Sequence, residues 1–357
     1  MLNLLRRTTI FRDLKRFRNT DMLPTMANNS DKRPTLRSLA EITGLGISTV
    51  SQALRNSSEI ASETRERVQL AARQMGYRPN RAGVRLRTGK SNVITLVLNA
   101  QDGGSGLFAN MIYGISDSLK GSSYHLVVTP YSLSDPMEPI RYIVETNSAD
   151  GVIISRTQAE DPRVRYLVDN NFPFTTHGRT DMGIEHSYFD FDNEAFAFEA
   201  LRLLKAKGRK HVALIGPPPS LNYYHHTFKG FERGLAEFGM TGFLVGGVDT
   251  DSEISQLQHA GLELAQRNDR PDGLVCVSSS VALAMISGLE QGQQRIGRDY
   301  DLVTKPLTDL VAMAQPAIIG LDEDFNTAGR ELARMVMARI AGTVPIELQM
   351  LDQPKLG

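Results

Sequence analysis

From residue 92 onward, short runs of branched apolar residues alternate with stretches that carry apolar residues at helical spacing. The apolar runs are NVITLVLN, YHLVVTP, DGVIISR, FPFTTHG, KHVALIG, GFLVGG, DGLVCV and YDLVT. Continuous apolar strands separated by amphipathic helices are typical of parallel sheets covered by helices on both faces. Their repetition over roughly 250 residues predicts an α/β body of two doubly wound lobes. Ligands of such folds bind at the carboxyl ends of the strands, so the loops after the strands are the candidate site.

The formal net charge of the 357 residues is +0, but the charges are unevenly distributed. Residues 32–90 hold twelve Lys or Arg against four Asp or Glu, and residues 1–31 hold six against three. The rest of the chain is therefore acidic. A basic N-terminal segment on an acidic body indicates a nucleic-acid binder with a separate second domain. A basic surface that is merely solvated is the alternative.

Residues 35–75 have the pattern of three short helices. Thr35 can cap the first helix, and Gly44 suits the tight turn that ends it. A second helix is expected over 47–54, and Ser62 is expected to cap a third. The outward face of the second helix is expected to carry Ile47, Ser48, Ser51, Gln52 and Arg55. Short hydroxyl and amide side chains let such a helix approach the major groove closely, so this segment is a predicted helix-turn-helix.

Three blocks in this region occur at a distinctive spacing: TVS at 49–51, ETRERV at 63–68 and GYRPN at 76–80. Together with the sensor-like body, they closely resemble the lac-repressor (LacI) family of bacterial regulators, with similarity over residues 33–345. The resemblance implies a dimeric repressor of operator DNA with an all-α headpiece. It also implies a two-lobed body, similar to periplasmic sugar-binding proteins, that senses a small molecule between its lobes.

The resemblance divides the chain into five segments. They are a disordered extension (1–32), a helix-turn-helix domain (33–79), a hinge helix or linker (80–90), a sensing and dimerisation body (91–345) and a C-terminal tail (346–357). Within the body, one lobe covers 91–191 and 322–343, and the other covers 192–321. The first 31 residues are either a basic arm that adds phosphate contacts or an overextended start, with translation beginning at Met22 or Met26.

Carried over by position, the resemblance places Ile47, Ser48 and Gln52 at the bases and places Thr49 and Ser51 at phosphates. The expected DNA contacts are Thr35, Ile47, Ser48, Thr49, Ser51, Gln52, Arg55, Tyr77, Asn80 and Leu86. This chain has Gln52 where the family mostly has Arg, and Gln fits adenine rather than guanine. It has Gly46 where the family usually has a capping Ser, which weakens the cap by about a few tenths of a kcal/mol.

Residues 80–90 match the family's hinge helix, in which a leucine wedges into the minor groove and bends the operator. Leu86 holds that position here. An apolar wedge unstacks a base step and lets a protein dimer wrap the DNA. Gly83 disfavours a helix by about 1 kcal/mol, so this hinge is expected to fold poorly away from DNA. A plain basic linker is the alternative.

The loops after the strands supply the expected effector contacts. Phe108 lies where the family keeps an aromatic residue that stacks on ligand, and a buried core phenylalanine is the alternative. Arg179 lies in HGR, which matches a family position where an arginine donates to ligand oxygens. The second lobe departs from the family, since Thr227 replaces an arginine and Ser279 replaces a ligand-binding aspartate. The expected ligand contacts are Phe108, Arg179, Tyr223, His226, Ser279 and Lys305.

Asp192 and Asn193 match a DN pair of the family, yet they open a helix, which favours capping over ligand contact. Aromatic residues together with Arg179, Lys305 and many hydroxyls favour a sugar as the effector. A purine or nucleoside is the alternative. A sugar effector would make the protein a regulator of carbohydrate uptake or catabolism genes.

Other classes of protein have little support. The sequence holds neither a G-x-S-x-G elbow nor a phosphate loop, and His225 and His226 are adjacent rather than at zinc-site spacing, so we expect no enzyme, cofactor or metal site. Cys276 lies in an apolar run typical of a buried thiol. No apolar run is long enough to span a membrane, and the N-terminus lacks a signal-peptide core. We therefore expect a cytoplasmic protein, not an exported solute-binding protein.

Overall fold

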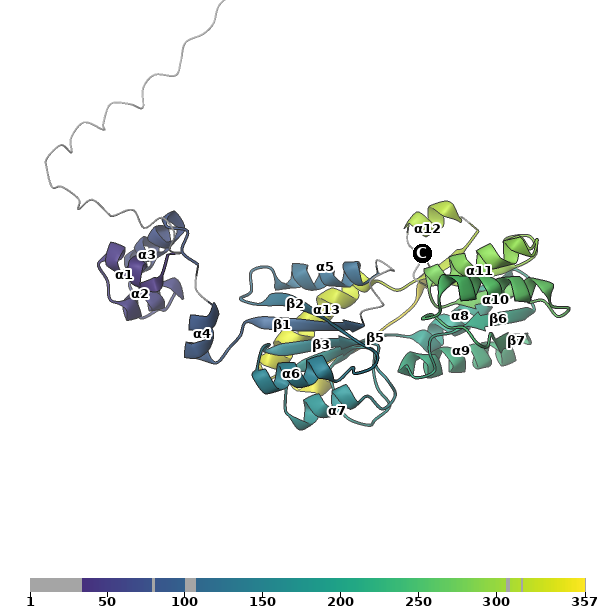
Figure 1. Ribbon diagram of the computed structural model, residues 1–357, viewed down its shortest axis with the longest axis horizontal. Coiled ribbons are helices and arrows are strands. Elements are labelled where there is room, and N and C mark those ends of the chain that lie inside the picture. The colour runs from purple at the N-terminus through teal and green to yellow at the C-terminus, as the bar shows by residue number, and fades with distance from the viewer. Residues whose placement is uncertain (1–33, 79–80, 100–106, 306–308, 316, 357) are drawn as a thin grey trace, which may run out of the picture. The chain divides into compact units, whose positions relative to one another are not determined.

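The structure is a computed structural model that describes residues 34–78, 81–99, 107–305, 309–315 and 317–356 (Figure 1). The expected extension over 1–32 and the expected DNA contact Asn80 lie outside these residues. Contacts divide the chain into two units, one up to Gly83 and one from Val84 on. Each unit is described by itself below.

The first unit is a three-helix domain formed by α1 (Leu36–Thr43), α2 (Ile47–Leu54) and α3 (Ser62–Gln74). Its core is small and consists of Leu39, Ala40, Val50, Ala53, Val68 and Ala72. Leu54 and Tyr77 pack against this core from the side. The predicted helix-turn-helix is confirmed.

Local chemistry explains where these helices begin and end. The Thr35 hydroxyl accepts a hydrogen bond from the Ser38 amide at 3.1 Å, while the Ser38 hydroxyl accepts one from the Thr35 amide at 2.8 Å. Gly44 ends α1 with φ 66°, a left-handed conformation that suits glycine. Gly46 precedes α2 without a side-chain cap, as expected. The expected cap of α3 is wrong: Ala61 occupies the cap position, and Ser62 is already helical.

Helix α4 (Arg81–Thr88) lies within the segment expected as a hinge, and the boundary between the two units falls inside it. Its sequence, RAGVRLRT, is basic and contains few apolar residues.

The second unit contains two six-stranded sheets, one in each lobe. The lobe 1 sheet has the order β11-β5-β4-β3-β1-β2, and all its strands are parallel. These strands are β1 (Val93–Asn99), β2 (His125–Tyr131), β3 (Gly151–Ser155), β4 (Phe174–His177), β5 (Tyr188–Phe191) and β11 (Gln349–Asp352). The lobe 2 sheet has the order β12-β10-β9-β8-β6-β7. Its strands are β6 (His211–Ile215), β7 (Thr241–Leu244), β8 (Gly273–Cys276), β9 (Asp301–Thr304), β10 (Ile319–Asp322) and the antiparallel β12 (Lys355–Leu356).

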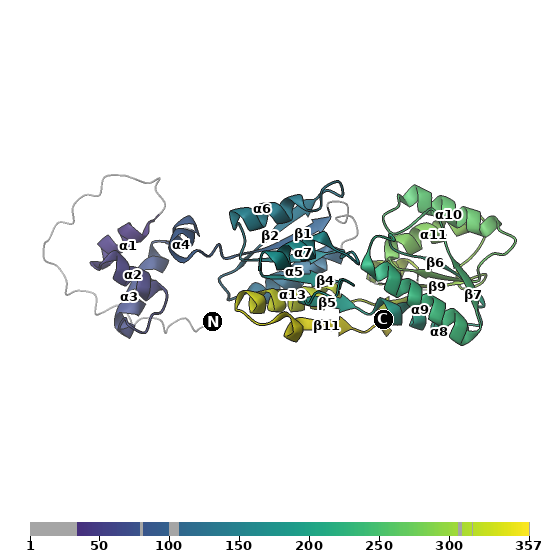
Figure 2. The same ribbon diagram turned by 90° about the horizontal axis from the view of Figure 1, so that it is seen from below.

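Helices cover both faces of each sheet, as the continuous apolar strands predicted (Figure 2). In lobe 1, α5 (Leu107–Leu119) and α13 (Phe325–Ile340) cover one face, while α6 (Glu138–Thr146) and α7 (Pro162–Asp169) cover the other. In lobe 2, α8 (Asn193–Ala206) and α9 (Asn222–Phe238) lie opposite α10 (Ile254–Gln266) and α11 (Ser279–Gln291). A short helix, α12 (Asp309–Ala314), follows β9. The predicted architecture of two doubly wound lobes is confirmed.

The chain crosses between the lobes at β5–α8, at β10–α13 and at β11–β12. The third crossing corrects the expected tail over 346–357, because residues 345–356 form the 3₁₀ turn Pro345–Leu348 and then one strand in each sheet. Both strands are short, and Lys355 and Leu356 are exposed, so no apolar alternation marked them as strands. Asp192 caps α8 through a bond from the Ala195 amide at 2.9 Å, as expected.

None of the helices in the described parts of the chain is long and apolar enough to cross a membrane.

Helices α5 and α13 pack so closely that glycines are required at their contact. A Cβ at Gly329 would lie 2.2 Å from the Met111 carbonyl oxygen, a backbone atom that has little freedom to move. A Cβ at Gly114 would lie 2.1 Å from the Asn326 carbonyl oxygen. These contacts join the first helix of lobe 1 to the last helix of the body.

We predict that Gly329→Ala lowers the free energy of unfolding by about 1–3 kcal/mol, because the added methyl forces the two helices apart. Chemical denaturation of the full chain measures this change. Gly246→Ala is the matched control, since a Cβ there has no atom within 4 Å and the residue has no left-handed φ. Equal stability of the two variants would contradict the close packing.

Candidate effector cleft and DNA-contact face

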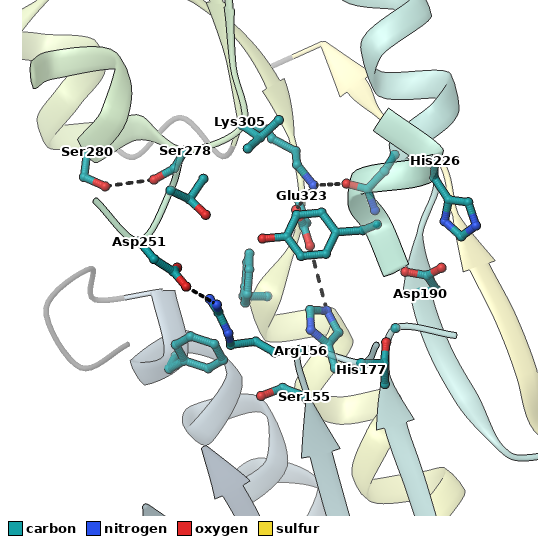
Figure 3. A pocket seen from close by; sticks show the side chains of 18 of the residues that line it. Ser155, Arg156, His177, Asp190, His226, Asp251, Ser278, Ser280, Lys305 and Glu323 are labelled. Atoms are coloured by element: carbon teal, nitrogen blue, oxygen red, sulfur yellow. Dashed lines mark hydrogen bonds and ion pairs between the residues drawn. The ribbon is translucent and has the colours of Figure 1, made fainter. Parts of the chain in front are cut away.

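A cavity of about 570 Å³ lies between the two lobes, at the carboxyl ends of strands from both sheets (Figure 3). Lobe 1 contributes residues 155–157 at the end of β3, residues 177–179 at the end of β4, and Asp190 of β5. Lobe 2 contributes the first turns of α9, residues 250–254, the loop after β8, and Lys305 after β9. The cavity therefore occupies the place where parallel α/β folds bind ligands.

Arg156 and Asp251 form an ion pair across the cleft, with 2.5 Å between Nη2 and Oδ2. Arg156 comes from lobe 1 and Asp251 from lobe 2 (Figure 3). Arg156 has φ 55°, which is uncommon for a residue other than glycine. A strained backbone conformation at a ligand site requires a surrounding structure that holds it.

A buried ion pair supplies that support. The Arg163 Nη2 donates to the carbonyl oxygens of Ser155 and Arg156 at 3.1 and 2.9 Å. The same guanidinium pairs with Asp161 at 2.7 Å, and both side chains are almost fully buried. Arg163 thereby fixes the turn from which Arg156 reaches across the cleft.

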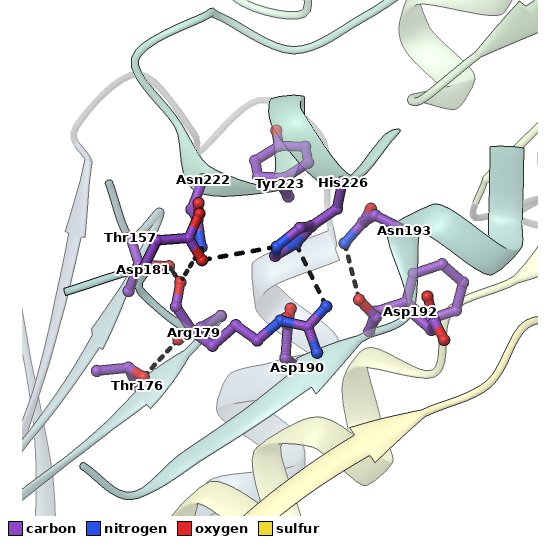
Figure 4. Close-up of polar contacts among 12 residues, drawn as sticks. Thr157, Thr176, Arg179, Asp181, Asp190, Asp192, Asn193, Asn222, Tyr223 and His226 are labelled. Carbon is purple, nitrogen blue, oxygen red and sulfur yellow. Dashed lines mark hydrogen bonds and ion pairs between the residues drawn. The ribbon is translucent and has the colours of Figure 1, made fainter. Parts of the chain in front are cut away.

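Arg179 lies at the centre of a second polar group (Figure 4). Its Nε lies 3.3 Å from Asp190 Oδ2, and its Nη2 donates to His226 Nδ1 at 3.5 Å. The backbone oxygen of Arg179 accepts bonds from Thr157 at 3.0 Å and from Asn222 at 2.9 Å. Since Asn222 and His226 belong to α9, this group joins the two lobes.

Lys305 lies in a buried aromatic cage. Its Nζ donates to Glu323 at 2.7 Å and to Asn193 at 2.5 Å. The ammonium lies 4.3 Å from the Phe191 ring centroid and 5.7 Å from that of Tyr223, which favours the cation further. Lys305 therefore lines the cavity as a residue already held by internal partners.

Burial in the cleft shifts the pKa values of Asp190 and of two histidines. Burial raises the pKa of Asp190 to about 7, although the nearby Arg179 acts in the opposite direction. Burial lowers the pKa of His177, 3.8 Å from Glu323, and it also lowers the pKa of His226. Because the Arg179 guanidinium only donates, a neutral His226 accepts at Nδ1 and carries its proton on Nε2.

Five of the six expected ligand residues line the cavity: Phe108, Arg179, Tyr223, His226 and Lys305. Phe108 also packs edge-to-face on Phe325, with 6.1 Å between the ring centroids, so it is part of the lobe 1 packing as well. Ser279 is the exception, because it is the first residue of α11 and is buried, while its neighbours Ser278 and Ser280 line the cavity.

The sequence interpretation missed Arg156, His177, Asp190, Asp251 and Glu323. Arg156 and His177 directly follow or end strands, so the rule about strand ends was a usable signal for both. Asp251 and Glu323 become cleft residues only because the two lobes face each other. No group of three or more His, Cys, Asp or Glu within the described ranges is placed to hold a metal ion.

In the first unit, most of the residues expected on the outward face of α2 are exposed. Ile47, Ser48 and Arg55 are exposed, and Gln52 is partly exposed. Gln52 Nε2 donates to Glu59 at 3.0 Å, which holds the amide at the surface. Ser51 is a correction: its side chain is buried, because it lies one helical turn before Leu54, which packs against the edge of the core.

The remaining expected DNA contacts differ in how exposed they are. Thr35 is exposed and caps α1, Thr49 is partly exposed, and Tyr77 is half-buried against the domain core. Leu86 of α4 is 91% exposed, which is unusual for a leucine.

Comparison with known proteins gives a family match in each of the two units. A model of the lacI family of bacterial regulatory proteins matches residues 35–80, and a model of the periplasmic binding protein-like domain matches residues 201–356. The HTH-type transcriptional regulator AglR of Rhizobium meliloti (strain 1021) is 33% identical over 315 residues, which cover 86% of this chain and 85% of AglR. The chain belongs to the LacI family. It is thus a member of a family of transcriptional regulators.

Solved LacI-family structures share the fold. The lac repressor dimer bound to operator and the anti-inducer ONPF matches with a TM-score of 0.77 and 18% identity, covering 91% of this chain and 98% of that chain. The transcriptional regulator CelR in complex with cellobiose matches with a TM-score of 0.67 and 23% identity, again covering 91% and 98%.

We predict that Asp190 makes stability depend on pH. Its pKa is raised in the folded protein, so the stability it contributes is complete below its ordinary value of 3.8 and is lost as the pH rises to about 7. Relative to Asp190→Asn, the wild type should lose about 1.4 kcal/mol of unfolding free energy for each pH unit in that window. Chemical denaturation at pH 5, 6, 7 and 8 measures the difference.

The exposed Asp169 at the end of α7 provides the control, since Asp169→Asn should keep the wild-type pH profile. Parallel profiles for the wild type and Asp190→Asn would show that Asp190 is ionised like a surface carboxylate.

Proposed function

We propose that the protein is a repressor that binds a palindromic operator as a dimer and senses a sugar in the cleft, and that it controls genes for carbohydrate uptake or catabolism. The cleft is the observation that carries this proposal. Polar side chains from both lobes meet in one cavity, and the same chain carries a helix-turn-helix unit. A ligand that contacts both lobes shifts their equilibrium if it binds one arrangement better than the other.

The similar proteins support the same reading. CelR was solved with cellobiose, and the lac repressor was solved as a dimer on its operator. A repressor acts where the DNA is, so we place this protein in the cytoplasm.

The aromatic residues of the cleft favour a sugar over a nucleoside. A base stacks on the open face of an aromatic side chain. Phe108 and Phe325 instead meet edge-to-face at 75°, and Phe325 lies at 54° to His177. These rings pack on one another, whereas hydroxyls and charged groups occupy much of the cavity wall.

Dimerisation has support from the surface of lobe 1. Strand β2 is the edge of its sheet and leaves Val127 and Val128 exposed. Tyr113 on the adjacent α5 is 64% exposed. Apolar residues gathered on an edge strand and a neighbouring helix suit contact with a second copy. Two copies on a two-fold axis would read a palindromic site.

We assign residues 80–90 to a hinge that inserts Leu86 into the minor groove. An almost fully exposed leucine on a basic helix has no partner in the core, and an apolar wedge beside arginines suits a bent operator. Gly83 weakens the helix by about 1 kcal/mol, so its folding would depend on DNA and on the partner copy.

We predict that Leu86→Ala weakens binding to an operator duplex, identified beforehand by binding-site selection with the wild type, by roughly a few kcal/mol. This is the scale of unstacking a base step. Binding to random DNA, which rests on phosphate contacts, should barely change. Fluorescence anisotropy with operator and random duplexes at one salt concentration measures both affinities. The control is Leu70→Ala, which removes a half-exposed leucine of α3. Equal losses of affinity for both duplexes would show that residues 80–90 are only a basic tether.

The sugar proposal predicts thermal stabilisation of the full chain by a neutral sugar. A ligand at 100 times its Kd adds about 2.7 kcal/mol to the free energy of unfolding. The panel contains cellobiose, maltose, melibiose, raffinose, sucrose, adenosine, cytidine and guanine. Stabilisation by nucleosides or guanine alone would refute the sugar and leave the regulator standing.

A further inference from the structure

Each positively charged side chain that lines the cleft has an acidic side chain of the same cleft beside it. Three permanent cations line the described part of the cavity: Arg156, Arg179 and Lys305. Each lies close to an acidic side chain, at 2.5 Å from Asp251, 3.3 Å from Asp190 and 2.7 Å from Glu323, respectively. Burial raises the pKa of Asp190 to about 7, so Asp190 is only partly ionised at neutral pH, while Asp251 and Glu323 give Arg156 and Lys305 full ion pairs. The acidic group of each pair comes from the cavity wall as well.

No other lysine or arginine lines the described part of the cavity. The two histidines in the lining, His177 and His226, have lowered pKa values because of burial and are therefore neutral at pH 7. A fourth carboxylate, Glu253, also lines the cavity and caps α10.

The other lining groups are neutral. Hydroxyls come from both lobes, and aromatic rings add apolar faces. These groups belong to Ser155, Thr157, Thr250, Ser252, Ser278, Ser280, Phe108, Tyr223 and Phe325. Paired charges, hydroxyls and ring faces match a molecule that offers hydroxyl groups and C–H faces without a charge of its own.

We infer that the effector is an uncharged polyhydroxy compound, a neutral sugar, and that the cleft rejects sugar phosphates, sugar acids and nucleotides. This inference rests on the proposed function, which places the effector in this cleft. It goes further by naming the charge of the effector and the groups that select for it.

The selection follows from the cost of unpaired charge. An anionic ligand would either take Arg156 from Asp251, or Lys305 from Glu323, or remain unpaired itself. In both cases one negative charge is left in a partly buried site without a counter-charge, which is strongly unfavourable. A neutral hydroxyl can instead donate to Asp190 or Asp251 and accept from Arg156 or Arg179 while the ion pairs stay intact.

The first test measures anion binding to the full chain by titration calorimetry at constant ionic strength and pH 7.5. The probes are inorganic phosphate, glucose 6-phosphate, trehalose 6-phosphate, gluconate and AMP. We expect no saturable binding below about 10 mM, well above typical effector affinities. Micromolar binding of any of these anions that depends on Arg156 would overturn the inference.

The second test removes one internal counter-charge. Asp251 is partly exposed at the cleft, so Asp251→Asn should fold and leave Arg156 without its carboxylate. We expect this variant to bind glucose 6-phosphate at least tenfold more tightly than the wild type. Asp269→Asn is the matched control, because it frees Arg267 from a similar 2.8 Å ion pair on the surface and should gain nothing. An Asp251→Asn variant that gains no anion affinity would contradict the role of the pairs.

A third comparison separates this inference from the proposed function. For any sugar that stabilises the protein, its phosphate ester should bind at least a hundredfold more weakly. A sugar phosphate that binds more tightly than its parent sugar would refute the neutral effector and support a sugar regulator. A nucleoside that binds while sugars do not would refute the sugar and leave the requirement for a neutral ligand intact.

Discussion

Parallel strand pairing brings the carboxyl ends of β3, β4 and β5 to one edge of the lobe 1 sheet, where Ser155, His177 and Asp190 line the cleft. The same pairing places the ends of β8, β9 and β10 at the facing edge of lobe 2. Three crossings of the chain keep the two edges opposite each other. The site therefore depends on sheet topology before it depends on any one side chain.

Within that frame, buried charge shapes the cleft. The Asp161–Arg163 pair holds the turn of Arg156, and Arg156 reaches Asp251 in the other lobe. Lys305 joins β9 to Glu323 at the second crossing and to Asn193 at the first. Buried ion pairs contribute little net stability, and replacement by apolar groups is often tolerated. Their presence at all these junctions of the cleft is better explained by positioning and by ligand selection than by stability.

The DNA-contact unit follows a different logic. Its core consists of six small or medium apolar residues, so it needs few constraints to fold. The polar outward face of α2 is free for recognition, and the Gln52–Glu59 bond already orders part of it. Helix α4 carries an exposed Leu86 beside arginines and contains Gly83, so it combines a feature that favours DNA with one that weakens the helix.

Sequence periodicity alone was enough to predict both lobes, the three headpiece helices and the Asp192 cap, because these depend on neighbours a few residues apart. Strand ends also indicated Arg179. By contrast, Ser51 lies at the edge of a helix face, where the pattern does not distinguish exposed from buried positions. The strands of 346–357 exist only because sheet edges were available to pair with them. Arg156 and its partner Asp251 are 95 residues apart and meet only because the two lobes face each other. Lys305 and Glu323 are 18 residues apart and meet because β9 pairs with β10 in the lobe 2 sheet.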